Sequence, residues 1–468
     1  MRRRIALVTT AALIPLLAAA GFADTVLAPA DRSGLALTLT QDDVALVRDR
    51  RTVALERGPQ LLLVEGVARQ ARDSSAVLSG NGVAVSEQGF QLAGIDADAL
   101  LAASVGKEVT VVWRDGAGAE REERAKVISA GPQPVFQVGG KVVAGSPVRV
   151  LYDALPPELR TLPAYRANVA VEAAGKRDVE LSYLTAGLSW QADYVAEMYP
   201  GDDKLALSSW ATLANAAGSD FANARVQVMA GEVNTVGDTS PVPRGVRLEK
   251  ALMAGAAMAA PAPASRQAVG GYHLYTLPQP VSLRDGERKQ VALMPPQQMA
   301  VERVLTLDPL PPHLWRDRAP EQEAEHPQTV LKLKNGSAEP LPAGTIRVFQ
   351  RARDGGAVFL GEDRLTPTPS GSSARVTLGR AFDVSARRVQ TDFNRVAAEI
   401  TEAAWQVKLT NAGDTPAKVV VRESFDGDWL VLEESTRHAK ENAFTVAWTV
   451  TVPPKGESVL TYRARVKG

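Results

Sequence analysis

The chain has 468 residues, 45% of them hydrophobic, a composition that allows about three packed domains and excludes disorder throughout. Charge is balanced, with 53 basic and 53 acidic residues, so the sequence lacks the positive field of a nucleic-acid-binding protein. There is no cysteine, which excludes disulfides, thiolate metal ligands and a cysteine nucleophile, and stability must come from apolar cores.

The N-terminus has the pattern of a bacterial export signal. Three arginines at 2–4 precede an apolar run over 5–20, and Ala23 ends a small-x-small cleavage site. Because the run is shorter than the roughly 20 residues of a membrane span, we expect a signal peptide over 1–23, cleaved after Ala23. The mature protein is then periplasmic or secreted, with no membrane span. An uncleaved anchor is the alternative.

The next two segments predict small β units joined by a helix. Residues 24–95 contain short apolar or alternating runs between charged turns, which predicts an N-terminal β domain. Residues 96–105 start with Asp, continue with strong helix formers and are followed by Gly106, so we expect a short helix there. Three or four strands between 107 and 143 then predict a small SH3-like barrel, and we assign 96–155 to the helix and barrel together.

The rest of the chain, 165–468, is predicted to form tandem antiparallel β-sandwiches, so the fold class is mainly β. Alternating apolar and polar residues mark strands over most of it, with Trp210 placed in the apolar pattern. The segment 236–271 is rich in Ala, Pro and Gly and is predicted to be a flexible loop. The last module, about 385–468, is predicted to be an Ig-like sandwich.

One local pattern occurs three times, at Asn215, Asn335 and Asn411. Each asparagine ends an alternating strand, is followed by a Gly-containing turn, and precedes a second alternating strand. Because Asn and Gly tolerate the left-handed conformation, we expect three antiparallel hairpins. The unequal spacing excludes a fixed-period solenoid and favours two or three similar sandwich modules.

Several stretches within 165–468 form a consistent set: LSYLTAGLSWQADYVAEMY, SSWATLANAAGSDFANARVQVMAGEVN, YHLYTLPQPVSLRDGERKQVAL, LGRAFDVSARRVQTDF and VPPKGESVLTYRARV. In these stretches the chain resembles the bacterial DUF4139 family, which includes mucoidy-inhibitor-like exported proteins. The resemblance implies a β-rich exported protein associated with envelope polysaccharide control. It supplies no catalytic residues. Many members carry a coiled coil where this chain has the helix and the small barrel.

No motif for catalysis or metal binding stands out, and we predict no catalytic, cofactor-binding or metal-binding residues. The four histidines, His273, His313, His326 and His438, lack the spacing of a compact zinc site. Ser189 follows Gly187 as in a nucleophile elbow, but the closing glycine is missing. Neighbouring carboxylates point to opposite faces of a strand, so we expect solvated positions for three such pairs, Glu433 with Glu434, Asp202 with Asp203, and Glu362 with Asp363.

The tryptophans raise the question of glycan binding. Trp190, Trp210, Trp405, Trp429 and Trp448 lie in alternating strands, where a large aromatic ring is more often part of a core. Trp315, in a proline-rich connection, is the exposed candidate.

Three functions follow. The first is a non-enzymatic exported protein that acts by protein contacts in the cell envelope and influences exopolysaccharide or surface assembly. The second is a glycan-binding module, and the third is a hydrolase with distant carboxylates facing each other across a cleft. The expected partners are envelope proteins or surface glycans, and we expect no cofactor.

Overall fold

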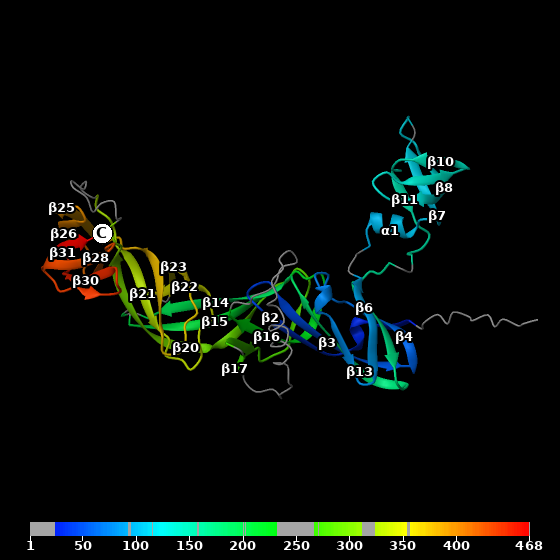
Figure 1. Ribbon diagram of the computed structural model, residues 1–468, viewed down its shortest axis with the longest axis horizontal. Coiled ribbons are helices and arrows are strands. Elements are labelled where there is room, and N and C mark those ends of the chain that lie inside the picture. The colour runs from blue at the N-terminus through cyan, green and yellow to red at the C-terminus, as the bar shows by residue number, and fades with distance from the viewer. Residues whose placement is uncertain are drawn as a thin grey trace, which may run out of the picture.

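The computed structural model describes residues 24–91, 95–114, 116–156, 159–199, 201, 203–231, 266–269, 271–310, 323–352 and 356–467. It is a row of β-sheets along one axis, with the N-terminal strands towards one end and the C-terminal strands at the other (Figure 1). The predicted mainly β class is confirmed. The predicted signal peptide, Trp315, His313 and nearly all of the predicted loop at 236–271 lie outside the described residues. Among the described helices, none is long and apolar enough to cross a membrane.

An N-terminal sandwich is formed by strands from both sides of the 96–155 segment. Its core includes Leu37, Val47, Leu62, Tyr165 and Tyr183. One sheet has the order β1-β4-β12-β6, where β1 is Asp24–Leu27, β4 is Gly58–Glu65, β12 is Ala164–Val171 and β6 is Val83–Gln91. The other contains β2 (Arg32–Leu39), β3 (Ala45–Leu55), β13 (Gly175–Thr185) and β5 (Val77–Gly80), with short 3₁₀ turns η1 (Pro29–Asp31) and η2 (Asp73–Ser75) at the connections.

The second of these sheets continues towards the middle of the molecule. Strand β2 pairs in parallel with a strand that lies almost 190 residues later in the chain. The added strands are β16 (Phe221–Ala230), β18 (Tyr272–Thr276), β17 (Arg266–Val269) and β19 (Val281–Leu283). Strand β17 lies near the C-terminal end of the segment predicted to be a loop.

The central sheet is organised around β20 (Arg288–Leu307), a strand of 20 residues. Its first part pairs with β15 over Lys204 to Ala214, and its last part pairs with β21 and β27. The same strand therefore belongs to the central sheet and to the C-terminal sandwich. The other strands here are β14 (Leu188–Met198), β15 (Lys204–Asn215), β21 (Gln328–Lys334), β22 (Gly344–Arg351), β23 (Ala357–Leu365) and β24 (Ser373–Arg380).

The C-terminal sandwich packs two sheets around the buried rings of Trp405, Trp448 and Tyr462. The Ig-like topology that the sequence predicted stays a prediction. One sheet contains β25 (Val384–Ala397), β26 (Ile400–Asn411), β31 (Gly456–Lys467) and β28 (Asp428–Glu434), and the other contains β27 (Ala417–Ser424), β30 (Thr445–Val452) and β29 (Ala439–Lys440).

The inserted unit, residues 95–156, stands apart from the row of sheets (Figure 1). Helix α1 (Ala97–Ala103) confirms the helix predicted at 96–105, and the Asp96 carboxylate caps it by accepting the Ala99 N–H at 2.7 Å. The SH3-like barrel stays a prediction. The strands form one antiparallel sheet in the order β10 (Lys141–Ala144), β9 (Val135–Val138), β8 (Glu120–Ser129), β7 (Glu108–Arg114) and β11 (Arg149–Leu151).

The three recurring asparagines are equivalent in structure as well as in sequence. Asn215, Asn335 and Asn411 are all buried. Each Nδ2 donates to the carbonyl four residues later, at 2.9, 2.9 and 2.8 Å, and to a carbonyl from another segment. Each Oδ1 accepts the backbone N–H two residues later.

The predicted hairpins at these asparagines are wrong. The strands before and after each turn pair with different partners, as when β15 pairs with β14 and β20 while β16 pairs with β2, β18 and β19. None of the three asparagines has a positive φ. The buried amide satisfies the backbone groups of the turn, so the chain can cross from one sheet to another instead of folding back on itself.

Candidate functional site

The described tryptophans divide into buried and accessible rings. Trp190, Trp405 and Trp448 are buried, as expected for strand tryptophans. Trp190 donates from Nε1 to the Met229 carbonyl at 2.9 Å, a typical arrangement for a core tryptophan. These three rings are therefore part of the hydrophobic cores and offer no surface to a ligand.

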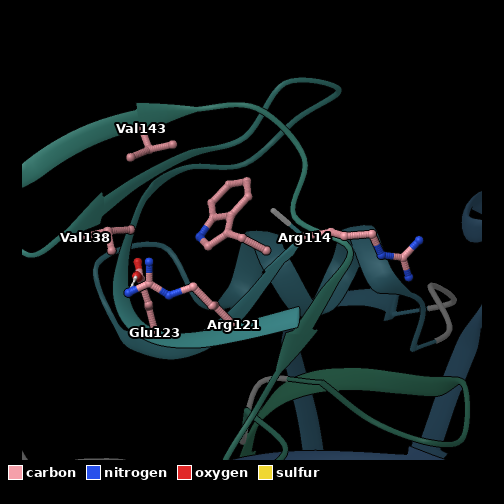
Figure 2. A pocket seen from close by; sticks show the side chains of 6 residues that line it. Arg114, Arg121, Glu123, Val138 and Val143 are labelled. Atoms are coloured by element: carbon pink, nitrogen blue, oxygen red, sulfur yellow. Dashed lines mark ion pairs between the residues drawn. The ribbon is translucent and has the colours of Figure 1, made fainter. Parts of the chain in front are cut away.

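A pocket of about 310 Å³ lies on the inserted unit and is lined by Trp113 (Figure 2). Trp113 is half-buried at the end of β7, and its ring meets Phe136 edge to face with 6.3 Å between centroids. Val138 of β9 and Val143 of β10 contribute apolar walls. The pocket thus opens where the unit's hydrophobic core reaches solvent.

Strand alternation explains this position. Val109 and Val111 precede Trp113 at two-residue spacing and are buried in the core of the unit. On the neighbouring strand β8, Arg121 lies directly opposite Trp113. The buried residue Ala125 lies opposite Val109, further into the core. The apolar face therefore ends in a tryptophan beside an arginine.

The charged groups of the pocket are accessible to solvent. Arg121 lies 3.5 Å from Glu123 in an ion pair, and 73% of the Arg121 side chain is exposed. Arg114 points the other way and pairs with Glu120 at 3.1 Å (Figure 2). The bond from Arg114, helped by Arg149, lowers the pKa of Glu120, so this carboxylate is fully ionised near neutral pH. Arg121 is the cation best placed to meet a ligand.

Trp113 is a pocket residue that the sequence patterns alone did not indicate. The available signal was its two-residue spacing from Val109 and Val111, followed at once by the charged stretch from Arg114. Chemically, an indole face with two valines accepts an apolar side chain, and Arg121 offers donors to a carboxylate.

Trp210 is the second accessible tryptophan, and its predicted place in the apolar pattern is wrong. The inward residues of β15 are Leu207, Ser209, Ala211 and Leu213, which leaves Trp210 on the outer face with 38% of its surface exposed. Two of the inward residues, Ser209 and Ala211, are small, so hydrophobicity alone does not show which face of the strand is buried.

A further polar cluster lies around Glu434 in the C-terminal sandwich. One oxygen of Glu434 accepts the Trp448 indole N–H and meets His438 Nδ1, both at 2.8 Å. Burial opposes ionisation of Glu434, but these bonds prevail and lower its pKa. Half-buried Trp429 lies beside His438 and under Lys440, whose Nζ is 4.8 Å from the ring centroid. The cluster joins strands of both sheets and explains why Glu434 is held rather than freely solvated.

The other residues considered from sequence occupy separate places. Gly187 has a positive φ of 78°, and a Cβ there would lie 2.8 Å from the Ala216 backbone, so the glycine serves a close approach of two turns. His326 contacts the Val384 carbonyl through Nδ1 at 2.9 Å. Asp363 accepts the Thr377 N–H at 2.6 Å, while Glu362 pairs with Arg347. Within the described ranges, His, Asp and Glu do not gather in any group of three suited to a metal ion.

No curated protein matches the chain. A family model described as a domain of unknown function (DUF4139) matches residues 179–467, which is more than half of the chain. The match begins within β13 and so leaves out the inserted unit with its Trp113 pocket. The chain belongs to the DUF4139 family.

Proposed function

We propose that this chain is an exported, non-enzymatic β protein that acts in the cell envelope by binding other proteins. The observation that carries the proposal is the Trp113 pocket, which combines an apolar floor with the exposed guanidinium of Arg121. This chemistry favours a partner segment that presents an apolar side chain next to a carboxylate. Through such contacts the protein would influence the assembly of surface polysaccharide.

The position of the inserted unit supports this proposal. The unit stands off the row of sheets, so a partner can reach its pocket without contacting the sandwiches (Figure 1). Its helix and sheet have a core of their own, which includes Leu101, Val127 and Phe136. A pocket on a packed framework needs little ordering when it binds, and this lowers the entropic cost of association.

Export is tested by fractionating cells and sequencing the N-terminus of the protein recovered. We expect a periplasmic or secreted protein that begins at Asp24. Recovery of the chain from the cytoplasm with its first 23 residues intact would contradict export.

Partner binding is tested by site-specific photo-crosslinking in intact cells. A photoreactive residue at Val143 lines the pocket, whereas one at Val142, its neighbour on β10, points to the other face and is 70% exposed. We expect a discrete protein adduct from position 143, none from position 142, and loss of the adduct when Trp113→Ala is added. Equal adducts at both positions, or an adduct that survives Trp113→Ala, would remove the pocket from the proposal.

Glycan binding is a second candidate function. It is favoured by Trp210, whose ring lies on an outer sheet face among polar side chains. Exposed indole rings stack on the apolar faces of sugar rings, while neighbouring polar groups bind the hydroxyls.

A further inference from the structure

We propose that the outer face of β22, β14, β15 and β20 is a binding platform for an extended, neutral polysaccharide. This inference rests on the second candidate function, glycan binding, and names the site and the class of glycan. The face is called the Trp210 platform here, and it consists of Gln191, Asp193, Trp210, Thr212, Gln290 and Arg347.

The first observation is that short side chains surround Trp210. Its cross-strand neighbours are Asp193 on β14 and Ala292 on β20. On its own strand the residues two positions away are Ser208 and Thr212. These four side chains are short, and 38% of the Trp210 surface is exposed and available for stacking.

The second observation is a fixed polar network around the ring. The Asp193 side chain is 10% exposed, and its carboxylate accepts hydrogen bonds from the Thr212 hydroxyl at 2.5 Å and from Arg347 at 3.0 Å. Gln290 donates to the Thr212 hydroxyl at 3.1 Å, and Gln191 donates to Thr345 at 3.3 Å. Because these groups already hold one another in place, binding a sugar hydroxyl costs little side-chain entropy.

The third observation concerns charge. Arg347 lies between Asp193 at 3.0 Å and Glu362 at 3.1 Å, and on the same face Arg351 pairs with Glu197 at 3.0 Å. The charges next to Trp210 are therefore matched, while two further cations of this face, Lys204 and Arg288, lie at the starts of β15 and β20, away from the ring. Charge complementarity points to a neutral glycan rather than to an acidic one or to nucleic acid.

The shape of the platform fits an extended chain. Four adjacent strands give three inter-strand spacings, or about 14 Å across the sheet. The strands of the platform lie in the middle of the molecule, where Figure 1 shows β22, β14, β15 and β20 side by side. A broad, gently twisted face accommodates several consecutive sugars, whereas a deep pocket would select a chain end.

The test is affinity gel electrophoresis of the full mature chain in gels that contain hydroxyethylcellulose or galactomannan, both neutral, or alginate, which is anionic. We expect retardation by a neutral polymer and none by alginate. Trp210→Ala should weaken the interaction about tenfold or more, as expected when an aromatic anchor is truncated. Arg347→Ala should weaken binding by a smaller factor. The substitution leaves the Trp210 ring in place and removes only one of the two hydrogen-bond donors to Asp193.

The matched control is Phe382→Ala, which removes an aromatic ring that is 92% exposed and lies outside both the platform and the Trp113 pocket, and which should leave retardation unchanged. Because 38% of the Trp210 surface is exposed, its substitution should lower the thermal midpoint only slightly, and a midpoint well above the assay temperature separates lost binding from lost folding. No retardation by either neutral polymer, retardation by alginate alone, or equal retardation of Trp210→Ala and wild type overturns the platform. Loss of binding in Trp113→Ala alone would instead place the glycan in the pocket of the inserted unit. None of these outcomes depends on the crosslinking result, so the platform and the protein-binding proposal fail separately.

Discussion

The N-terminal and C-terminal sandwiches each bury an arginine with a carboxylate, but they satisfy the pair to different degrees. In the N-terminal sandwich, Arg51 bonds Asp49 at 2.7 and 3.1 Å and donates to the carbonyls of Leu27 and Glu65. Arg32 adds a bond to Asp49 at 3.0 Å. This pair is saturated with hydrogen bonds and ties one sheet to the other.

The C-terminal pair is looser. Arg388 and Glu423 approach only to 3.7 Å, and Glu423 Oε1 and Arg388 Nε are buried without a hydrogen bond. Burial raises the pKa of Glu423, opposed by Arg388, the Leu310 N–H and the Tyr462 hydroxyl. We therefore expect a buried charge to stabilise a sandwich only where its hydrogen-bond partners are complete.

The largest effect is expected for Asp49→Ala. The substitution leaves the Arg51 guanidinium buried without its counterion, which typically costs about 3 to 5 kcal/mol. Urea unfolding measures the loss, and Asp178→Ala, at an exposed carboxylate bonded to Thr52, is the control that should change little. A loss no larger than that of the control would show that the saturated pair does not stabilise the sandwich.

A smaller loss, roughly 2 to 3 kcal/mol, is expected for Asn335→Ala. The change removes one of two donors from each of the carbonyls of Glu339 and Thr368, and it removes the acceptor of the Ser337 N–H in a buried turn. Exposed Asn394 on β25 provides the control Asn394→Ala. If the two variants have the same unfolding midpoint, the recurring asparagines do not hold the crossings between sheets.

The smallest effect, within about 1 kcal/mol at neutral pH, is expected for Glu423→Gln. Glutamine keeps an acceptor for the Leu310 N–H, which lies 3.0 Å from the carboxylate, and removes the buried charge. Because the folded-state pKa of Glu423 lies above its ordinary value of 4.5, the stability it contributes is full below that value and is lost as pH rises through the folded pKa.

The free energy of unfolding should therefore shift in favour of Glu423→Gln as pH rises from 4 to 7. Urea titrations of both proteins across this range measure the shift. If the wild type instead becomes more stable relative to the variant as pH rises, the attraction of Arg388 for the Glu423 carboxylate outweighs the effect of burial. The buried pairs of the two sandwiches would then both be stabilising.

Local patterns predicted the local structure of this chain well. The acidic cap at Asp96 and the glycine after the helix located α1, and the three asparagines revealed a true structural recurrence. The partners of the strands were not predictable, because nothing near Asn215 encodes which sheet the next strand will join. Pairing at long range depends on the packing of the whole core.

The exposure of the accessible tryptophans likewise depends on neighbouring strands and could not be predicted from local sequence. Trp210 was predicted to be buried because its strand has small residues in the inward positions, so hydrophobicity alone favoured the wrong phase. Trp113 lies at the end of a buried run of β7. The pocket also needs Arg121, which β8 places opposite Trp113, and this pairing could not be read from the residues around Trp113.

Strand β20 carries a mechanical consequence. One continuous backbone pairs with β15 of the central sheet over its first part and, through Leu305 to Leu307, with β27 of the C-terminal sandwich at its end. A force applied between the central sheet and the C-terminal sandwich would therefore be carried in part by the β20 backbone and by its hydrogen bonds to β27. Through this shared strand, the position of the C-terminal sandwich is coupled to that of the central sheet.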